Sequence, residues 1–243
     1  MRFIVMHKTD PVMEAGGPPD QSIIQNMGAL VQESIKSGVF TNGAGLHPSS
    51  RRVRLQCRGG EWSVTRGPYA GQNELVAAVT MISAKSLEAA VQHAKRLGSA
   101  LGDCEIEVGP VVEPWDLGLI PKPDNAPERF LLLTKSATED EAAGSSAARH
   151  VAATAKLAES LGDSGAVLAA ETFAPSSSGN RLAAGPKARR VWVDGPFAES
   201  KELISGFSLL KLDSKAEALA WAERYAEILG EKNEVDIRIV NEV

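Results

Sequence analysis

Apolar residues in the first half of the chain follow two spacings. Between residues 23 and 35 they recur every three or four positions, which predicts one face of an amphipathic helix, and Gly38 fits its end. A second helix is predicted after Ser86, a residue type that caps helices. Short apolar or alternating runs predict strands at residues 3–6, 39–46, 53–57, 61–65, 75–82 and 105–108.

The strand predicted at residues 53–57 carries basic side chains on one face. Arg52, Arg54 and Arg58 alternate with apolar residues, which is typical of a half-buried strand whose polar face meets solvent. An anion site on that face is the alternative. Gly59 and Gly60 then predict a hairpin turn into the next strand.

The second half repeats this plan. A strand is predicted at residues 130–133, a helix face at residues 150–161, strands at 191–194 and 204–212, a helix capped by Ser214, and a final strand at 235–239. Each half therefore consists of a strand, a helix, a run of antiparallel strands, a helix and a strand. This order predicts an α+β fold of two ferredoxin-like repeats, whose sheets can cover each other face to face.

A turn shared by both halves supports a duplication. Residues 194–202 read Asp-Gly-Pro-Phe-Ala-Glu-Ser-Lys-Glu, and residues 66–74 read Arg-Gly-Pro-Tyr-Ala-Gly-Gln-Asn-Glu, 128 positions earlier. A Pro-Ser-Ser turn recurs at a separation of 127, at residues 48–50 and 175–177. The region between the two turns has gained one residue, and we expect further small shifts in the last third.

Proline marks the boundary between the repeats. Residues 114–127 hold 4 of the 13 prolines, at positions 114, 121, 123 and 127. Proline removes backbone donors and favours extended chain, so this stretch is predicted to be a semi-rigid linker. The predicted organisation is a repeat at 1–113 with a degenerate motif, a linker at 114–128, and a repeat at 129–243 with the intact motif.

Composition excludes several classes of protein. With 26 basic and 31 acidic residues the net charge is −5, which disfavours nucleic acid as a partner. The two cysteines, Cys57 and Cys104, do not make a disulfide framework, and we expect buried small side chains in a reducing compartment. The apolar run near the N-terminus is too short for a signal peptide or a membrane span. We therefore expect a cytoplasmic protein without a membrane partner.

The motif at residues 194–202, preceded by Trp192-Val193 and followed by Gly206-Phe207, resembles the signature of the YCII-related family in its Asp-Gly-Pro-Phe branch. The resemblance covers most of residues 129–243 and, more weakly, residues 1–113. It implies a dimeric α+β barrel of ferredoxin-like units, here a pseudo-dimeric barrel within one chain. Relatives in this family include some with a proposed His and Asp active site, at least one that resembles a dehalogenating lyase of aromatic degradation, and others that accompany transcription factors. The first half departs from the motif at Arg66, Gly71 and Asn73, which puts any function there in doubt.

Asp194 is the first candidate site residue. The face formed by Arg190, Trp192 and Asp194 matches Trp62, Val64 and Arg66, which we expect to point inward. An inward Asp beside Trp can have a raised pKa and act as an acid or base, with Arg190 and Trp192 binding substrate. The alternative is that Asp194 accepts backbone hydrogen bonds and fixes the turn. Lys201 can pair with Asp194 or bind an anionic substrate, or it can be solvated.

Three further residues are candidates. His150 replaces Ile23 on the repeated helix face, and Thr154 lies one turn later, so the two line a polar pocket or meet water. His47 precedes the Pro-Ser-Ser turn and is a substrate-binding candidate or a loop residue. The four His and two Cys show no metal-ligand spacing, and no phosphate-binding loop appears, so no metal or cofactor is expected.

The leading hypothesis is an asymmetric small-molecule site between the repeats. A lyase or proton-transfer reaction would use Asp194, with His150 as a second catalytic candidate. The alternatives are a non-catalytic sensor or partner-binding module, and a structural duplicate. A second copy of the two-repeat chain is a further candidate partner.

Overall fold

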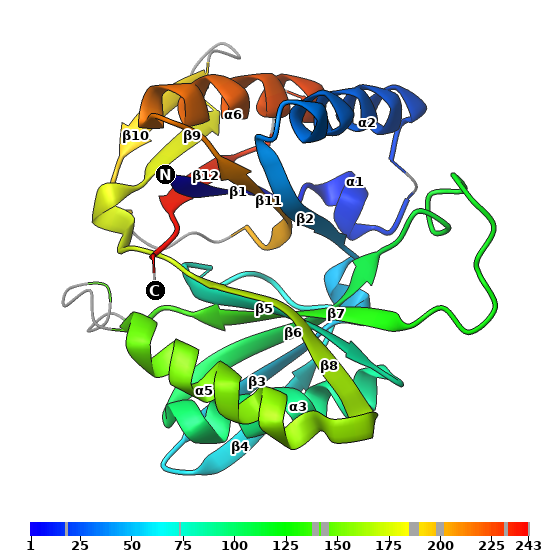
Figure 1. Cartoon of the computed structure of the whole chain (residues 1–243), viewed down its shortest axis with the longest axis vertical. Helices are drawn as coiled ribbons and strands as arrows, with labels where there is room; N and C mark the ends of the chain where they lie inside the picture. Colours follow the sequence, from blue (N-terminus) through cyan, green and yellow to red (C-terminus); the bar gives the residue numbers. More distant parts are fainter. Residues whose placement is uncertain are drawn as a thin grey trace.

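The computed structural model describes residues 1–17, 19–72, 74–137, 141, 146–184, 190–197, 202–230 and 233–242. The fold is α+β, with antiparallel strands and helices packed on them (Figure 1). Within the described residues no helix is both long and apolar enough to cross a membrane.

The first half contains the predicted elements in the predicted order. Ser86 accepts a hydrogen bond from the Ala89 amide at the start of the second long helix, and Gly38 ends the first one with φ 75°. Gly59 and Gly60 both have positive φ, as a tight hairpin requires. The elements are β1 (Arg2–Lys8), α1 (Pro11–Glu14), α2 (Gln21–Lys36), β2 (Phe40–Leu46), β3 (Val53–Arg58), β4 (Glu61–Arg66), β5 (Val76–Ala84), α3 (Leu87–Leu101) and β6 (Cys104–Val112).

The second half repeats this series from residue 128 onward. Ser214 caps its last helix by accepting from the Glu217 amide, as predicted. The elements are β7 (Glu128–Lys135), α5 (Ser146–Leu161), β8 (Gly165–Thr172), β9 (Asn180–Ala184), β10 (Arg190–Asp194), β11 (Ile204–Lys211), α6 (Lys215–Leu229) and β12 (Val235–Ile239).

The strands form two sheets, and each sheet takes strands from both halves of the chain. Sheet A has the order β10-β9-β12-β1-β11-β2, and sheet B has the order β4-β3-β6-β7-β5-β8. The four strands β12-β1-β11-β2 have the ferredoxin-like arrangement, as do β6-β7-β5-β8. The expectation that each half builds its sheet alone is therefore wrong, because the first strand–helix–strand unit of one half pairs with the last unit of the other.

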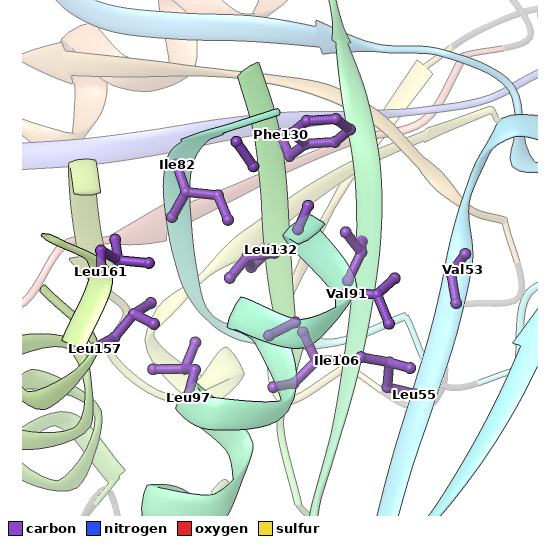
Figure 2. Packing of buried hydrophobic residues seen from close by; sticks show 14 of the residues in the cluster. Val53, Leu55, Ile82, Val91, Leu97, Ile106, Phe130, Leu132, Leu157 and Leu161 are labelled. Carbon is purple, nitrogen blue, oxygen red and sulfur yellow. The ribbon is translucent and has the colours of Figure 1, made fainter. Parts of the chain in front are cut away.

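Two helix layers enclose two layers of strands (Figure 1), and a buried hydrophobic cluster lies between each pair of neighbouring layers. One cluster joins α2 and α6 to sheet A, and another joins α3 and α5 to sheet B, where Phe130, Leu132 and Ile106 pack toward the helices (Figure 2). The third cluster lies between the sheets and includes Met6 and Phe207 of sheet A. The two sheets thus cover each other's inner faces.

The sheets also touch at two equivalent junctions. Leu46 at the end of β2 pairs with Val111 of β6, and Phe173 just after β8 bridges to Val240 just after β12. Leu46 and Phe173 are 127 positions apart in the sequence. Each half therefore contributes an equivalent residue to one of the two junctions between the sheets.

Burial corrects two expectations about strand faces. Arg52 and Arg54 are 1% and 5% exposed, so the prediction of a solvated basic face is wrong for these two residues, whereas Arg58 at the end of β3 is exposed. Val64 and Arg66 are exposed, so the predicted inward face of β4 is wrong beyond Trp62, which packs against α3. Cys57 and Cys104 face each other on neighbouring strands as free thiols, and burial raises the pKa of Cys104 to about 11.

Candidate functional site

The Gly-Pro turn has the same backbone geometry in both halves. Gly67-Pro68 and Gly195-Pro196 are both cis peptide bonds. The Gly67 amide donates to the Arg52 carbonyl and the Gly195 amide donates to the Gly179 carbonyl, each at 3.1 Å. A Cβ atom on either glycine would lie 1.7 Å from a serine carbonyl oxygen, so only glycine fits.

The turn places an aromatic ring over an arginine. The Arg54 guanidinium lies 4.4 Å from the centre of the Tyr69 ring, and the Arg181 guanidinium lies 4.5 Å from that of Phe197. Such stacking is a cation–π contact. Although the first half has Arg66 where the second has Asp194, it has the same turn and an aromatic ring in the same stacked position. The carboxylate of Asp194 is therefore not required for this turn.

Each stacked arginine belongs to a cluster of charges between the sheets. The first cluster comprises Arg52, Arg54, Glu74, Glu105, Glu107 and Lys135. Arg52 Nη1 lies 2.9 Å from Glu107 Oε1, and Arg54 Nη2 lies 2.8 Å from Glu74 Oε1. Lys135 Nζ contacts Glu74 and lies 3.7 Å from Glu107 Oε2. The cluster holds three cations and three carboxylates, so its charges balance.

The second cluster comprises Lys8, Arg181, Glu234 and Asp236. Lys8 Nζ lies 3.0 Å from Asp236 Oδ2, and Arg181 Nε lies 2.6 Å from Asp236 Oδ1 and 3.2 Å from Glu234 Oε1. Lys8 and Lys135 are 127 positions apart, as are Arg54 and Arg181. The second cluster is therefore the counterpart of the first.

One substitution and one change of position leave the second cluster with fewer partners. In the first cluster, Gln56 donates to Glu105 at 2.7 Å, but Ala183 takes the place of Gln56 beside Glu234. Glu74 is 1% exposed and contacts Lys135, whereas its counterpart Glu202 is exposed. Among the described residues, Lys8 is thus paired with Asp236 alone, and Glu234 with Arg181 alone.

Burial and charge give the two carboxyl groups of the second cluster different acidities. Burial raises the pKa of Glu234, and nearby Asp236 raises it further against the opposing effect of Arg181. Burial alone would also raise the pKa of Asp236, but Lys8 and Arg181 together hold it below its usual range. Two neighbouring carboxyl groups with pKa values pushed apart are a common arrangement for acid–base chemistry.

The candidates on β10 lie outside both clusters. Arg190 Nη2 donates to the carbonyl of Ala226, at the C-terminal end of α6. Trp192 Nε1 donates to Glu223 of the same helix at 2.7 Å. Asp194 is exposed, and its Oδ1 accepts from Asn180 Nδ2 at 2.5 Å. This face of β10 therefore packs toward α6, while Lys201 lies outside the described residues.

The remaining candidates lie apart from β10. His150 is 4% exposed and its Nδ1 lies 2.8 Å from the Ser146 carbonyl one turn earlier in α5. Thr154 lines an open depression of about 330 Å³ together with Arg2 and Thr172. His47 Nε2 lies 3.2 Å from Asp116 Oδ2, and burial together with Arg51 lowers the pKa of His47. The candidate residues therefore do not converge on one site.

Sequence reasoning missed the second cluster although a signal was present. Charged residues recur at the same strand positions in both halves, as Lys8 and Lys135 do. A charged residue that both copies keep at the same strand position is expected to have an oppositely charged partner inside the protein. The partner of Lys8 is Asp236 on β12, which is far from it in the sequence. In the part of the chain that the structure describes, no group of three His, Cys, Asp or Glu residues could hold a metal ion.

Comparison with known proteins agrees with the duplicated structure. The family model of the YCII-related domain matches the chain twice, over residues 1–111 and 129–240. No curated protein and no solved structure matches the chain. Since the two matches cover most of the sequence, this chain belongs to the YCII-related family and carries two copies of its domain.

Proposed function

We propose that the chain is an enzyme of the proton-transfer or lyase type, acting on a small anionic molecule at the second cluster. Glu234 is the acid or base, while Lys8 and Arg181 hold the anionic group. The proposed architecture is a pseudo-dimeric barrel, which the core between the sheets and the two strand junctions support.

The single observation that carries the proposal is that Glu234 is both partly exposed and raised in pKa. Its side chain is 22% exposed, so a substrate can reach it, and burial raises its pKa toward the range useful for proton transfer. Its first-half counterpart Glu105 is held by Gln56 and Arg54. Glu234 is thus the better placed of the two carboxyl groups to exchange a proton with a ligand.

The cations beside Glu234 support an anionic substrate. The side chain of Arg181 is 11% exposed and that of Lys8 is 1% exposed, so both charges act in a site that largely excludes water. Electrostatic stabilisation of a developing negative charge is strongest in such surroundings. A carboxylate-bearing substrate that loses a proton would benefit from both cations.

Asp194 remains a second candidate for the acid or base. Its exposure and its independence from the turn geometry favour a role other than fixing the backbone. It lies on the α6 side of β10, however, whereas the second cluster lies between the sheets. The two candidates therefore predict different sites and can be tested separately.

The alternative function is non-catalytic, either as a sensor or as a scaffold. The balanced pairing of the first cluster favours this view, because a saturated network of buried charges stabilises one arrangement of strands without any ligand. In that case both clusters serve the fold alone.

A thermal-shift screen with small carboxylates and phosphates separates these functions. We expect a ligand that stabilises the wild-type protein and loses its effect in Glu234→Gln, but not in the matched variant Glu105→Gln. Any hit is then incubated with the protein and its proton exchange followed by NMR. Loss of the effect in Asp194→Asn instead would assign the site to β10. Equal responses from all variants would support the non-catalytic alternative.

A further inference from the structure

Strand β10 is an edge strand with exposed apolar side chains. Within the described residues it pairs only with β9. Val191 and Val193 are 48% and 45% exposed on the face turned away from α6. An edge strand with unpaired backbone groups is a template for pairing with another strand.

The outward backbone groups of β10 can be assigned from its pairing with β9. Asp194 lies opposite Asn180, and the next amide, that of Gly195, donates to Gly179. In an antiparallel pair this makes Asp194 and Asn180 a non-hydrogen-bonded pair. Hydrogen bonding alternates along the strand, so the amides and carbonyls of Arg190, Trp192 and Asp194 point away from β9.

We infer that two copies of this chain associate by antiparallel pairing of their β10 strands about Trp192. The outward groups of Trp192 then meet those of the second copy's Trp192, and Arg190 lies opposite the other copy's Asp194. Val191 lies opposite Val193 on the other face. Opposite charges and β-branched residues directly across a strand pair are both stabilising, so the sequence of β10 is complementary to itself.

The equivalent edge strand of the first half lacks this property. In β4 the amide of Gly67 donates to Arg52, so Trp62, Val64 and Arg66 carry the outward groups. Pairing of two β4 strands about Val64 would place Arg66 opposite Trp62, with no opposite charge. Charge complementarity therefore selects β10 as the self-association surface.

The expected dimer is weak. Two five-residue strands bury much less than the roughly 1,200 Å² of a stable specific interface. We expect concentration-dependent association of the full chain in sedimentation velocity between about 10 and about 500 µM. The backbone amides of residues 190–194 should exchange hydrogen more slowly at the highest protein concentration than at the lowest. The exchange rates of residues 61–66 should not change with concentration.

Substitutions at exposed positions test the surface without disturbing the core. The double variant Val191→Lys with Val193→Lys places lysines opposite each other across the pair, and should weaken association about tenfold or more. The matched double variant on β4, Ser63→Lys with Thr65→Lys, should associate like the wild type, because both side chains are exposed there. A wild-type chain that stays monomeric throughout, a β10 double variant that dimerises equally well, or equal weakening by the β4 double variant would each overturn the inference.

Discussion

Arg52 and Arg238 perform the same task from non-equivalent positions in the two halves. Arg52 Nε donates to the carbonyl of His47, and Arg238 Nε donates to that of Ala174, 127 positions later. Arg52 lies beside Gly109 of the neighbouring strand, whereas Arg238 lies beside Gly179. The arginine and the glycine have thus exchanged strands between the two copies, which indicates that this pocket requires one guanidinium and has room for only one.

This exchange predicts the outcome of moving the arginine. Arg52→Gly should lower the free energy of unfolding by about 3 kcal/mol, because it breaks a buried ion pair with Glu107. Adding Gly109→Arg should restore at least about half of the loss, since Arg238 reaches the equivalent carbonyl from that position. Urea denaturation measures the free energy of unfolding of the wild type, of Arg52→Gly and of the double variant.

The single variant Gly109→Arg is the control for this experiment. A Cβ atom there would lie 3.2 Å from Arg52 Cγ, so the arginine should destabilise the protein when Arg52 is still present. A double variant no more stable than Arg52→Gly would show that the two positions are not interchangeable.

The turn glycines should tolerate no side chain in either half. Gly195→Ala and Gly67→Ala should each cost about 4 kcal/mol or more, because the added carbon overlaps a backbone carbonyl. Gly28→Ala in α2 meets no atom within 4 Å and should stabilise by about 0.5–1 kcal/mol. Calorimetric melting compares the three, and a mild effect at either turn would contradict the geometry.

Stability should depend on pH through His7. Its Nδ1 lies 2.7 Å from Tyr225 Oη, and burial, with Arg52 and Lys8 opposing Asp10, lowers its pKa to about 4. As pH falls from about 6.5 to about 4, the unfolded chain binds the proton first, so the folded state should lose about 3 kcal/mol. The variant His7→Gln should show a flatter profile over this window. An NMR titration that places the His7 pKa above 6 would refute the assignment.

Two aspartates of the second half should differ in their effect on stability. Among the described residues, Asp236→Asn leaves Lys8 without its charged partner and Arg181 with Glu234 alone, and should cost about 3 kcal/mol. Asp194→Asn should change the melting temperature by less than about 2 °C, because Asp194 is exposed and the turn forms without it in the first half. A large loss in Asp194→Asn would restore the turn-fixing role.

Local patterns predicted most of the elements but misjudged the polar strand faces. The helix ends at Gly38, Ser86 and Ser214 depend on capping, which is decided by a few neighbouring residues. The alternation around Arg52 and Arg54 was equally clear, yet both side chains are buried. An alternating strand has the same sequence pattern whether its polar face meets water or an opposite charge.

The sequence alone determined the duplication, the order of helices and strands, and the Gly-Pro turn shared by both halves. These features depend on residues a few positions apart, and both copies repeat them. Only the tertiary structure decided which half supplies each strand of a sheet, because two similar copies present similar strand edges to one another. The same long-range pairing brings Lys8 to Asp236, 228 positions away, and so creates the second cluster. A buried lysine is tolerated only where the fold places a carboxylate beside it.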